Sequence, residues 1–224
     1  MDRSFVGLEG KVVADRYAVD ELLHVGVTSF VYRGTVGPYR RDVVLKALAP
    51  ELVRDARRVE RFRAEAHALS LLKHPHVVGF VDLVQHDKFP IIVLERIRGP
   101  LLAEKLALYG RLSPERAAKI LVQVLSALTV AHEAEIIHRD VRPHNIVSDP
   151  IAVRGTDVVK LIDFGSAWIK ELDDEPKPVH AKELGSGRAF IPPECARGAP
   201  YDHRSEIFAV AATLYLAITG IRPN

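Results

Sequence analysis

The sequence predicts an α+β chain in two parts, an antiparallel sheet with one helix followed by a mainly helical portion. Three observations indicate this. The first third alternates short segments rich in valine and aromatic residues with Gly, Pro and Thr punctuation, as in strands joined by hairpins. Between Asp55 and Leu72 the apolar spacing changes to three or four residues. After Gly99 and Pro100 the pattern is mostly helical, and a cleft between two such lobes is a natural ligand site.

Five strands and one helix are expected in the first part. The helix ends before Pro75, and its apolar stripe consists of Val59, Phe62, Ala66, Leu69 and Leu72. The expected strands cover residues 17–25, 30–36, 42–48, 80–86 and 90–96.

The second part is expected to begin with a long helix. Ser113 followed by Pro114 is typical of an N-cap with proline at the first helical position. Residues 166–187 hold few large apolar side chains and are interpreted as a mobile loop. A last apolar helix is expected near His203. The buried stripe of the long helix is predicted at Ala117, Ile120, Leu121, Val124, Leu125 and Leu128.

Composition bounds the possible functions. The 224 residues are 48% hydrophobic, enough for a core of ordinary size. The formal charge of +2 gives no broad basic field, so no nucleic-acid partner is expected. A single cysteine, Cys195, excludes an internal disulfide framework, and no histidine spacing is typical of zinc. The longest apolar runs are too short to cross a bilayer, so we expect a soluble, cytoplasmic chain.

The stretch "IIHRDVRPHNIV" (136–147) is the most informative one. Its apolar ends predict two short buried segments that hold the polar residues between them. Transfer of a phosphoryl group from ATP needs a carboxylate for the acceptor hydroxyl, oxygen ligands for magnesium and cations on the phosphates. Asp140 is the candidate carboxylate, and Asn145 and Asp163 are candidate magnesium ligands. Arg142 is the candidate to steady the transferred phosphate.

With these residues in view, the chain resembles a eukaryotic-type protein kinase domain of the Ser/Thr superfamily. The catalytic-loop pattern HRDxxxxN is matched at 138–145, DFG at 163–165, and PE at 193–194. "VVLK" resembles the strand that carries the phosphate-binding lysine, Lys46, and "FRAEA" offers Glu65 as its partner. With "VLERI" (93–97) as the implied hinge, six elements in the right order, spread over residues 17–223, form a strong joint match.

The resemblance implies a bilobal fold that binds ATP and Mg²⁺ and phosphorylates a protein substrate. It implies an N-terminal extension at 1–16, an N-lobe at 17–97 and an incomplete C-lobe at 98–224. His138 is expected to pack in the core rather than act as a base. The residues implied for nucleotide binding are Leu23, Gly26, Ser29, Val31, Val44, Lys46, Leu94, Glu95, Ile97 and Val147.

Several positions depart from the family pattern. His24 replaces the first glycine of the nucleotide loop, and Val44 stands where alanine usually packs on adenine. Glu206 replaces the aspartate that braces the catalytic loop. Family members continue through further helices after "TGIRPN", and without them Glu194 is expected to be unpaired and apolar helix surface exposed. Such a surface implies a chain cut short, a covering partner or a degenerate domain.

Other interpretations stay open at this point. Lys46 also fits a solvated strand end, and Asp140, Asn145 and Asp163 fit ordinary turns. Negative charge for Arg139 is expected either from a phosphorylated Ser186 or from the acidic residues at 173–175. The basic residues of the first helix fit a solvated face or a phosphate-binding surface. For the whole chain, the alternatives to an active Ser/Thr kinase are a pseudokinase scaffold and a small-molecule phosphotransferase.

Overall fold

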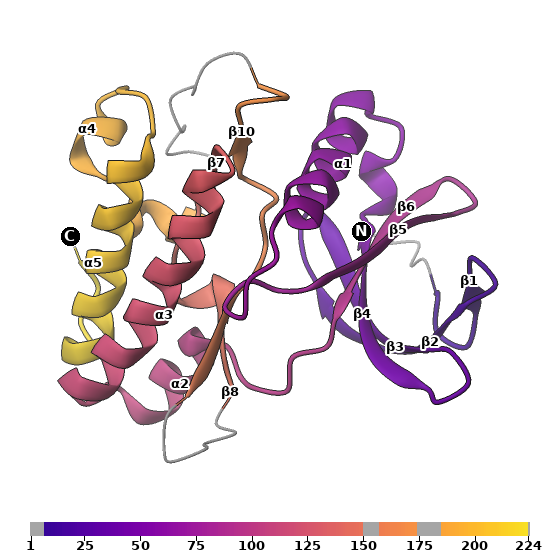
Figure 1. Cartoon of the computed structure of the whole chain (residues 1–224), viewed down its shortest axis with the longest axis horizontal. Coiled ribbons are helices and arrows are strands. Elements are labelled where there is room, and N and C mark those ends of the chain that lie inside the picture. Colours follow the sequence, from indigo (N-terminus) through magenta and orange to yellow (C-terminus); the bar gives the residue numbers. More distant parts are fainter. Residues whose placement is uncertain (1–6, 150–156, 174–184, 224) are drawn as a thin grey trace. The chain divides into compact units, whose positions relative to one another are not determined.

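The computed structural model describes residues 7–149, 157–173 and 185–223, whose elements are drawn in Figure 1. Contacts divide the chain into two compact units. The described residues of the first are 7–70 and 79–96, and those of the second are 71–78 and everything described from 97 onward. The chain thus passes from the first unit into the larger part of the second between Arg96 and Ile97, one residue before the expected boundary. Strands dominate the first unit and helices the second, which confirms the predicted α+β class.

The first unit contains an antiparallel sheet of six strands. In spatial order these are β1 (Val12–Val13), β2 (Tyr17–Val25), β3 (Ser29–Val36), β4 (Arg41–Leu48), β6 (Phe89–Glu95) and β5 (Phe80–His86). The five expected strands are all present within one residue at each end. The sixth strand, β1, pairs with β2 through Val13 and Tyr17.

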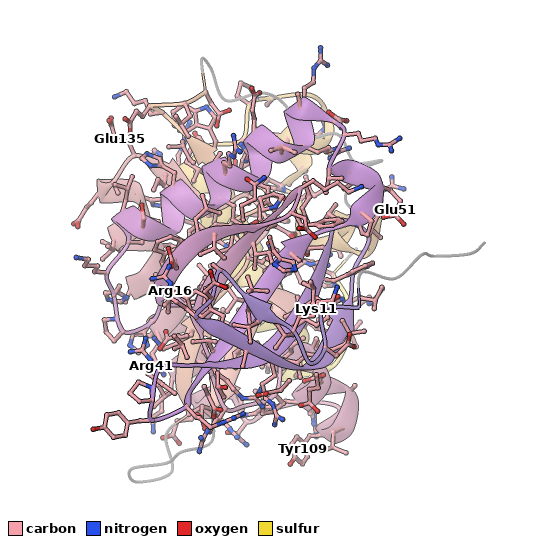
Figure 2. All side chains as sticks on the ribbon, turned by 90° about the vertical axis from the view of Figure 1, so that its right-hand side faces the viewer. Lys11, Arg16, Arg41, Glu51, Tyr109 and Glu135 are labelled. Carbon is pink, nitrogen blue, oxygen red and sulfur yellow. The ribbon has the colours of Figure 1, made fainter. Side chains whose placement is uncertain are left out.

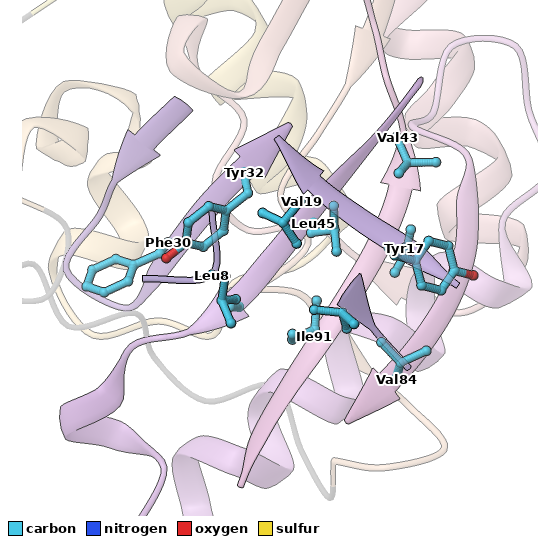
Figure 3. Close-up of a cluster of buried hydrophobic side chains, with 12 residues drawn as sticks. Leu8, Tyr17, Val19, Phe30, Tyr32, Val43, Leu45, Val84 and Ile91 are labelled. Carbon is cyan, nitrogen blue, oxygen red and sulfur yellow. The ribbon is translucent and has the colours of Figure 1, made fainter. Parts of the chain in front are cut away.

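One face of this sheet carries the core of the first unit. Figure 3 shows Val19, Tyr32, Leu45 and Ile91 gathered there, and Tyr32, Leu45 and Ile91 are fully buried. Leu8 joins them, although it precedes the first strand that the alternation reveals. The segment expected to be an extension therefore supplies part of the core.

Helix α1 (Ala56–Leu71) follows a short 3₁₀ turn, η1 (Pro50–Leu52). Asp55 begins the helix, because its Oδ1 accepts the backbone N–H groups of Arg57 at 3.0 Å and Arg58 at 3.3 Å. The helix buries Phe62, Ala66 and Leu69 of the predicted stripe together with Glu65, whereas Val59 is half-buried and the buried Leu72 follows the end of the helix. An acidic residue inside a buried stripe requires a partner, which the candidate site supplies.

The second unit is built around two helices that pack together, α3 (Pro114–Glu133) and α5 (His203–Thr219). Ser113 caps α3 as predicted, because its Oγ accepts the Arg116 N–H at 3.3 Å. Asp202 caps α5 in the same way. The shorter helices are α2 (Leu102–Tyr109) and α4 (Pro193–Ala196).

Two small antiparallel pairs hold the loops of the second unit. β8 (Ile146–Asp149) pairs with β9 (Val158–Leu161), and β7 (Ile136–Ile137) pairs with β10 (Trp168–Ile169). The prediction of a loop throughout 166–187 is therefore wrong at Trp168–Ile169, whose buried Ile169 pairs with buried Ile136. Residues 185–190 form a 3₁₀ turn, η3 (Gly185–Phe190), whereas 174–184 lie outside the described residues.

A buried ion cluster fastens the β8–β9 pair to the helices. Lys105 Nζ lies 2.7 Å from Asp157 Oδ1 and 2.8 Å from Ser148 Oγ, and Arg116 Nε lies 2.6 Å from Asp157 Oδ2. Hydrogen bonds from Arg116 and Lys105 outweigh burial and lower the pKa of Asp157 to about 2. Asp157 therefore stays ionised at neutral pH. Its ion pairs with Lys105 and Arg116 link α2 and α3 to the start of β9.

The surface of the first unit mixes charges of both signs. Figure 2 labels Lys11, Arg16 and Arg41 on this unit, and Arg16 pairs with Asp82 at 2.5 Å. In the second unit, exposed apolar side chains on α5 include Ile207 and Tyr215, as the sequence leads one to expect. Within the described ranges, none of the helices is long and apolar enough to span a membrane.

Candidate active site

The stretch 136–147 begins and ends in buried strands, as predicted. Residues 138–145 lie between β7 and β8, and the last three of them form the 3₁₀ turn η2 (Pro143–Asn145). His138 is fully buried, its Nε2 lies 3.1 Å from Ile162 O, and its ring packs edge-on against Phe164 with centroids 4.6 Å apart. The loop after it begins with Arg139 at φ +67°, a left-handed conformation that non-glycine residues seldom adopt. Both ends of the reactive loop are thus fixed by buried groups.

Asn145 connects the loop to the strand that precedes Asp163. Its side-chain Nδ2 donates to Asp140 Oδ2 and to Asp140 O, both at 2.8 Å. Its backbone O accepts the Ile162 N–H at 2.9 Å. Asp163 follows at φ +64° with an exposed side chain, whose Oδ1 lies 3.3 Å from the Gly165 N–H. The three side chains that the sequence singles out for acid, amide and carboxylate chemistry thus gather in one unit.

Asp140 lies in an environment that favours proton uptake. Burial raises the pKa of its carboxyl group, and the nearby charge of Asp163 raises it further. The charge of Arg142 and the hydrogen bond from Asn145 act in the opposite direction without reversing the shift. Arg142 Nε lies 3.5 Å from Asp140 Oδ1, an ion pair without a hydrogen bond at that nitrogen. A carboxylate with a raised pKa is better matched to accept a proton near neutral pH.

A buried carboxylate on α5 hydrogen-bonds to the backbone of the loop 138–145. Glu206 is fully buried, and its Oε1 accepts the Arg139 backbone N–H at 2.8 Å. Its other oxygen lies 2.5 Å from His132 Nε2 at the end of α3. The extra methylene of Glu206 is therefore accommodated, since the carboxylate still reaches the loop. Sequence reasoning missed His132, because its partner lies 74 positions away.

Lys46 and Glu65 form a buried ion pair in the first unit. Lys46 Nζ on β4 lies 2.6 Å from Glu65 Oε1 on α1, with side chains 12% and 3% exposed. This placement argues against the interpretation of Lys46 as a solvated lysine. Strand register puts Val31 opposite Lys46 and Leu94 opposite Val44, so these four residues share one face of the sheet. Val31 and Val44 are only half-buried there, unlike the fully buried core residues of the other face.

The other residues expected at the nucleotide are distributed over both units. Gly26 donates its N–H to Ser29 O at 2.9 Å in the turn between β2 and β3, and Leu23 is 44% exposed on β2. Glu95 lies at the end of β6, where its N–H donates to Gly79 O at 2.8 Å. Ile97 and Val147 belong to the second unit, where Val147 is buried on β8.

The segment after η3 holds the PE pair. Glu194 is exposed at the start of α4, so its carboxylate is solvated rather than buried without a partner. Cys195 beside it is buried, with Sγ 3.3 Å from Ser205 Oγ. Asp173, one of the acids considered for Arg139, accepts the Ile169 N–H at 2.9 Å, whereas residues 174 and 175 lie outside the described residues. The side chain of Ser186 is likewise outside the described part.

Comparison with known proteins agrees with this geometry. A family model of the protein kinase domain matches residues 17–224, so the chain belongs to the protein kinase domain family. It is 38% identical over 216 residues to the serine/threonine-protein kinase pkn3 of Myxococcus xanthus, covering 96% of this chain and 39% of that protein. It is 33% identical over 216 residues to the serine/threonine-protein kinase PknB of Mycobacterium tuberculosis, covering 94% and 33% respectively. The chain thus spans about a third of the length of the curated relatives it matches.

Proposed function

We propose that the chain is a magnesium- and ATP-dependent Ser/Thr protein kinase domain, with 17–97 as its N-lobe and 98–224 as its C-lobe. The observation that carries the proposal is the contact of Asn145 with Asp140, in the same unit as Asp163. A proton acceptor and two oxygen ligands side by side are what phosphoryl transfer to a hydroxyl requires.

The residues fit a magnesium ion chemically. Mg²⁺ takes a few hard oxygens, keeps several waters and is commonly held with the phosphates of its nucleotide. Asn145 uses its amide nitrogen for Asp140, which directs its oxygen to a different partner, and Asp163 presents an exposed carboxylate. Asn145 and Asp163 would hold the metal, which when bound supplies charge neutralisation at the phosphates.

The protein side of the reaction follows from the same contacts. Asp140 orients the acceptor hydroxyl and takes its proton, while Arg142 next to it steadies the transferred phosphate. In the first unit, Glu65 orients the Lys46 ammonium, which contacts the phosphates of the bound nucleotide. The adenine lies against Val31, Val44 and Leu94, with Leu23, Gly26, Ser29, Ile97 and Val147 around the nucleotide. Because the Glu95 N–H is used by Gly79, the adenine amino group meets the Glu95 carbonyl.

A thermal-shift measurement tests nucleotide binding. A ligand that binds only the folded chain at 100 times its Kd adds about 2.7 kcal/mol of stability, so Mg²⁺-ATP is expected to raise Tm by about 5–10 °C. Asp163→Asn is expected to lose the part of the shift that depends on Mg²⁺ and to keep the part seen with ATP alone. No shift at millimolar Mg²⁺-ATP would contradict the proposal. A shift without any phosphate transfer would instead indicate the pseudokinase, which the replacement of a loop glycine by His24 favours.

A further inference from the structure

The exposed side of the catalytic loop carries a cluster of cationic groups. Arg142 lies beside Asp140, and His144 is exposed one residue before Asn145. Pro143 and Asn145 on either side of His144 are buried, whereas His144 itself is an exposed residue. The Asn145 N–H donates to Arg142 O at 2.9 Å, which fixes the turn that presents both side chains.

A third cation reaches the same place from the end of α5. The helix ends at Gly220, where an added Cβ would lie only 2.8 Å from Gly110 O, so the chain after α5 passes directly over the end of α2. Leu112 N–H also donates to Ala217 O at 2.8 Å across this junction. Since α2 packs against η2, the exposed Arg222 comes close to the catalytic loop. Arg142, His144 and Arg222 are hereafter the cationic rim.

Electrostatics agree with this placement. Burial, the charge of Arg142 and the charge of Arg222 all lower the pKa of His144, and the charge of Asp140 opposes them. Among the described residues, Asp140 is the one acid whose charge acts on His144 in this way. As guanidinium groups, Arg142 and Arg222 carry positive charge whatever the state of His144. Arg142 is paired with Asp140, and Asp163 adds a second negative charge nearby, so the charge that distinguishes the rim is that of Arg222.

We propose that the cationic rim selects acceptor segments that carry Asp or Glu next to the hydroxyl to be phosphorylated. This inference rests on the proposed kinase function. A segment whose hydroxyl lies at Asp140 has to cross the exposed side of the loop, and each extended residue advances about 3.3–3.6 Å. We expect side chains one to three residues from the hydroxyl to meet His144 and Arg222. Complementary charge there favours acidic segments and repels basic ones.

Steady-state phosphorylation of three matched peptides tests this selection. Each peptide has one serine, flanked by Ala, by Asp or by Lys. The expected kcat/KM for the Asp peptide exceeds that for the Ala peptide about fivefold, the effect of one exposed ion pair, and the Lys peptide is the poorest. Arg222→Glu is expected to remove the preference, and His144→Glu to weaken it independently. The control Lys73→Glu makes the same charge change at an exposed position on a different segment and is expected to keep the preference.

The outcomes separate the two proposals. Equal kcat/KM for the three peptides, or an unchanged preference in both rim variants, would overturn the selection while leaving kinase activity intact. If no peptide is phosphorylated, the kinase proposal fails. The binding affinities of the same three peptides, now carrying a fluorescent label, then test whether the rim prefers acidic segments. Tighter binding of the Asp peptide, lost in Arg222→Glu, supports the rim, whereas equal binding of all three overturns it.

Discussion

Asp140→Asn is expected to lower kcat by about 10²–10⁴ fold, the usual contribution of a positioned general base. The substitution keeps the size of the side chain, and an amide oxygen at position 140 still accepts the Asn145 Nδ2 hydrogen bond. The loop is therefore expected to keep its conformation, and only the ability to take the hydroxyl proton is lost. The measurement is the initial rate of radiolabelled γ-phosphate transfer to a peptide at saturating Mg²⁺-ATP.

A matched control makes the same chemical change elsewhere. Asp87 is exposed in the turn between β5 and β6 at φ +52°, a conformation that asparagine tolerates. Asp87→Asn is expected to leave kcat unchanged. Equal rates for the wild type and Asp140→Asn would remove Asp140 from the chemistry.

Glu206→Ala is expected to destabilise the chain by about 2–5 kcal/mol, because it removes a fully buried carboxylate that contacts His132 and the Arg139 N–H. The truncation leaves His132 and the Arg139 N–H without their acceptor and opens a cavity below the loop. The measurement is the free energy of unfolding from urea denaturation.

Two further variants separate charge from shape. Glu206→Gln keeps an oxygen that can accept the Arg139 N–H, so a smaller loss is expected. Glu60→Ala truncates an exposed glutamate on α1, and a change within about 0.5 kcal/mol is expected. If Glu206→Ala were as stable as the wild type, Glu206 would not be the brace of the catalytic loop.

The fold was predictable where an element is long enough to contain several repeats of its apolar pattern. The strands β2 and β4 alternate visibly, and the stripe of α1 repeats over about four turns. The two-residue strands β1 and β10 are too short for any period, so their pairing depends on burial of Val13 and Ile169 by the rest of the unit. Local capping was equally visible, because Ser113 acts on a residue three positions away.

The candidate site was predictable as residue types in order but not as a network. Spacing within the loop indicates Asp140 and Asn145, and the resemblance indicates Lys46 and Glu65. The contacts that support them join positions far apart along the chain. His132 contacts Glu206, 74 positions later, and Lys105 contacts Asp157, 52 positions later. No local sequence pattern indicates such pairs, because tertiary packing alone brings their side chains together.

The most direct test of the proposed chemistry is a crystal structure of the chain with Mg²⁺ and a non-hydrolysable ATP analogue. We expect a metal ion about 2.1 Å from an oxygen of Asn145 and an oxygen of Asp163, with Lys46 on the phosphates and Asp140 facing the terminal one. A nucleotide bound without metal contacts from Asn145 and Asp163, or with Asp140 turned away from its terminal phosphate, would contradict the account.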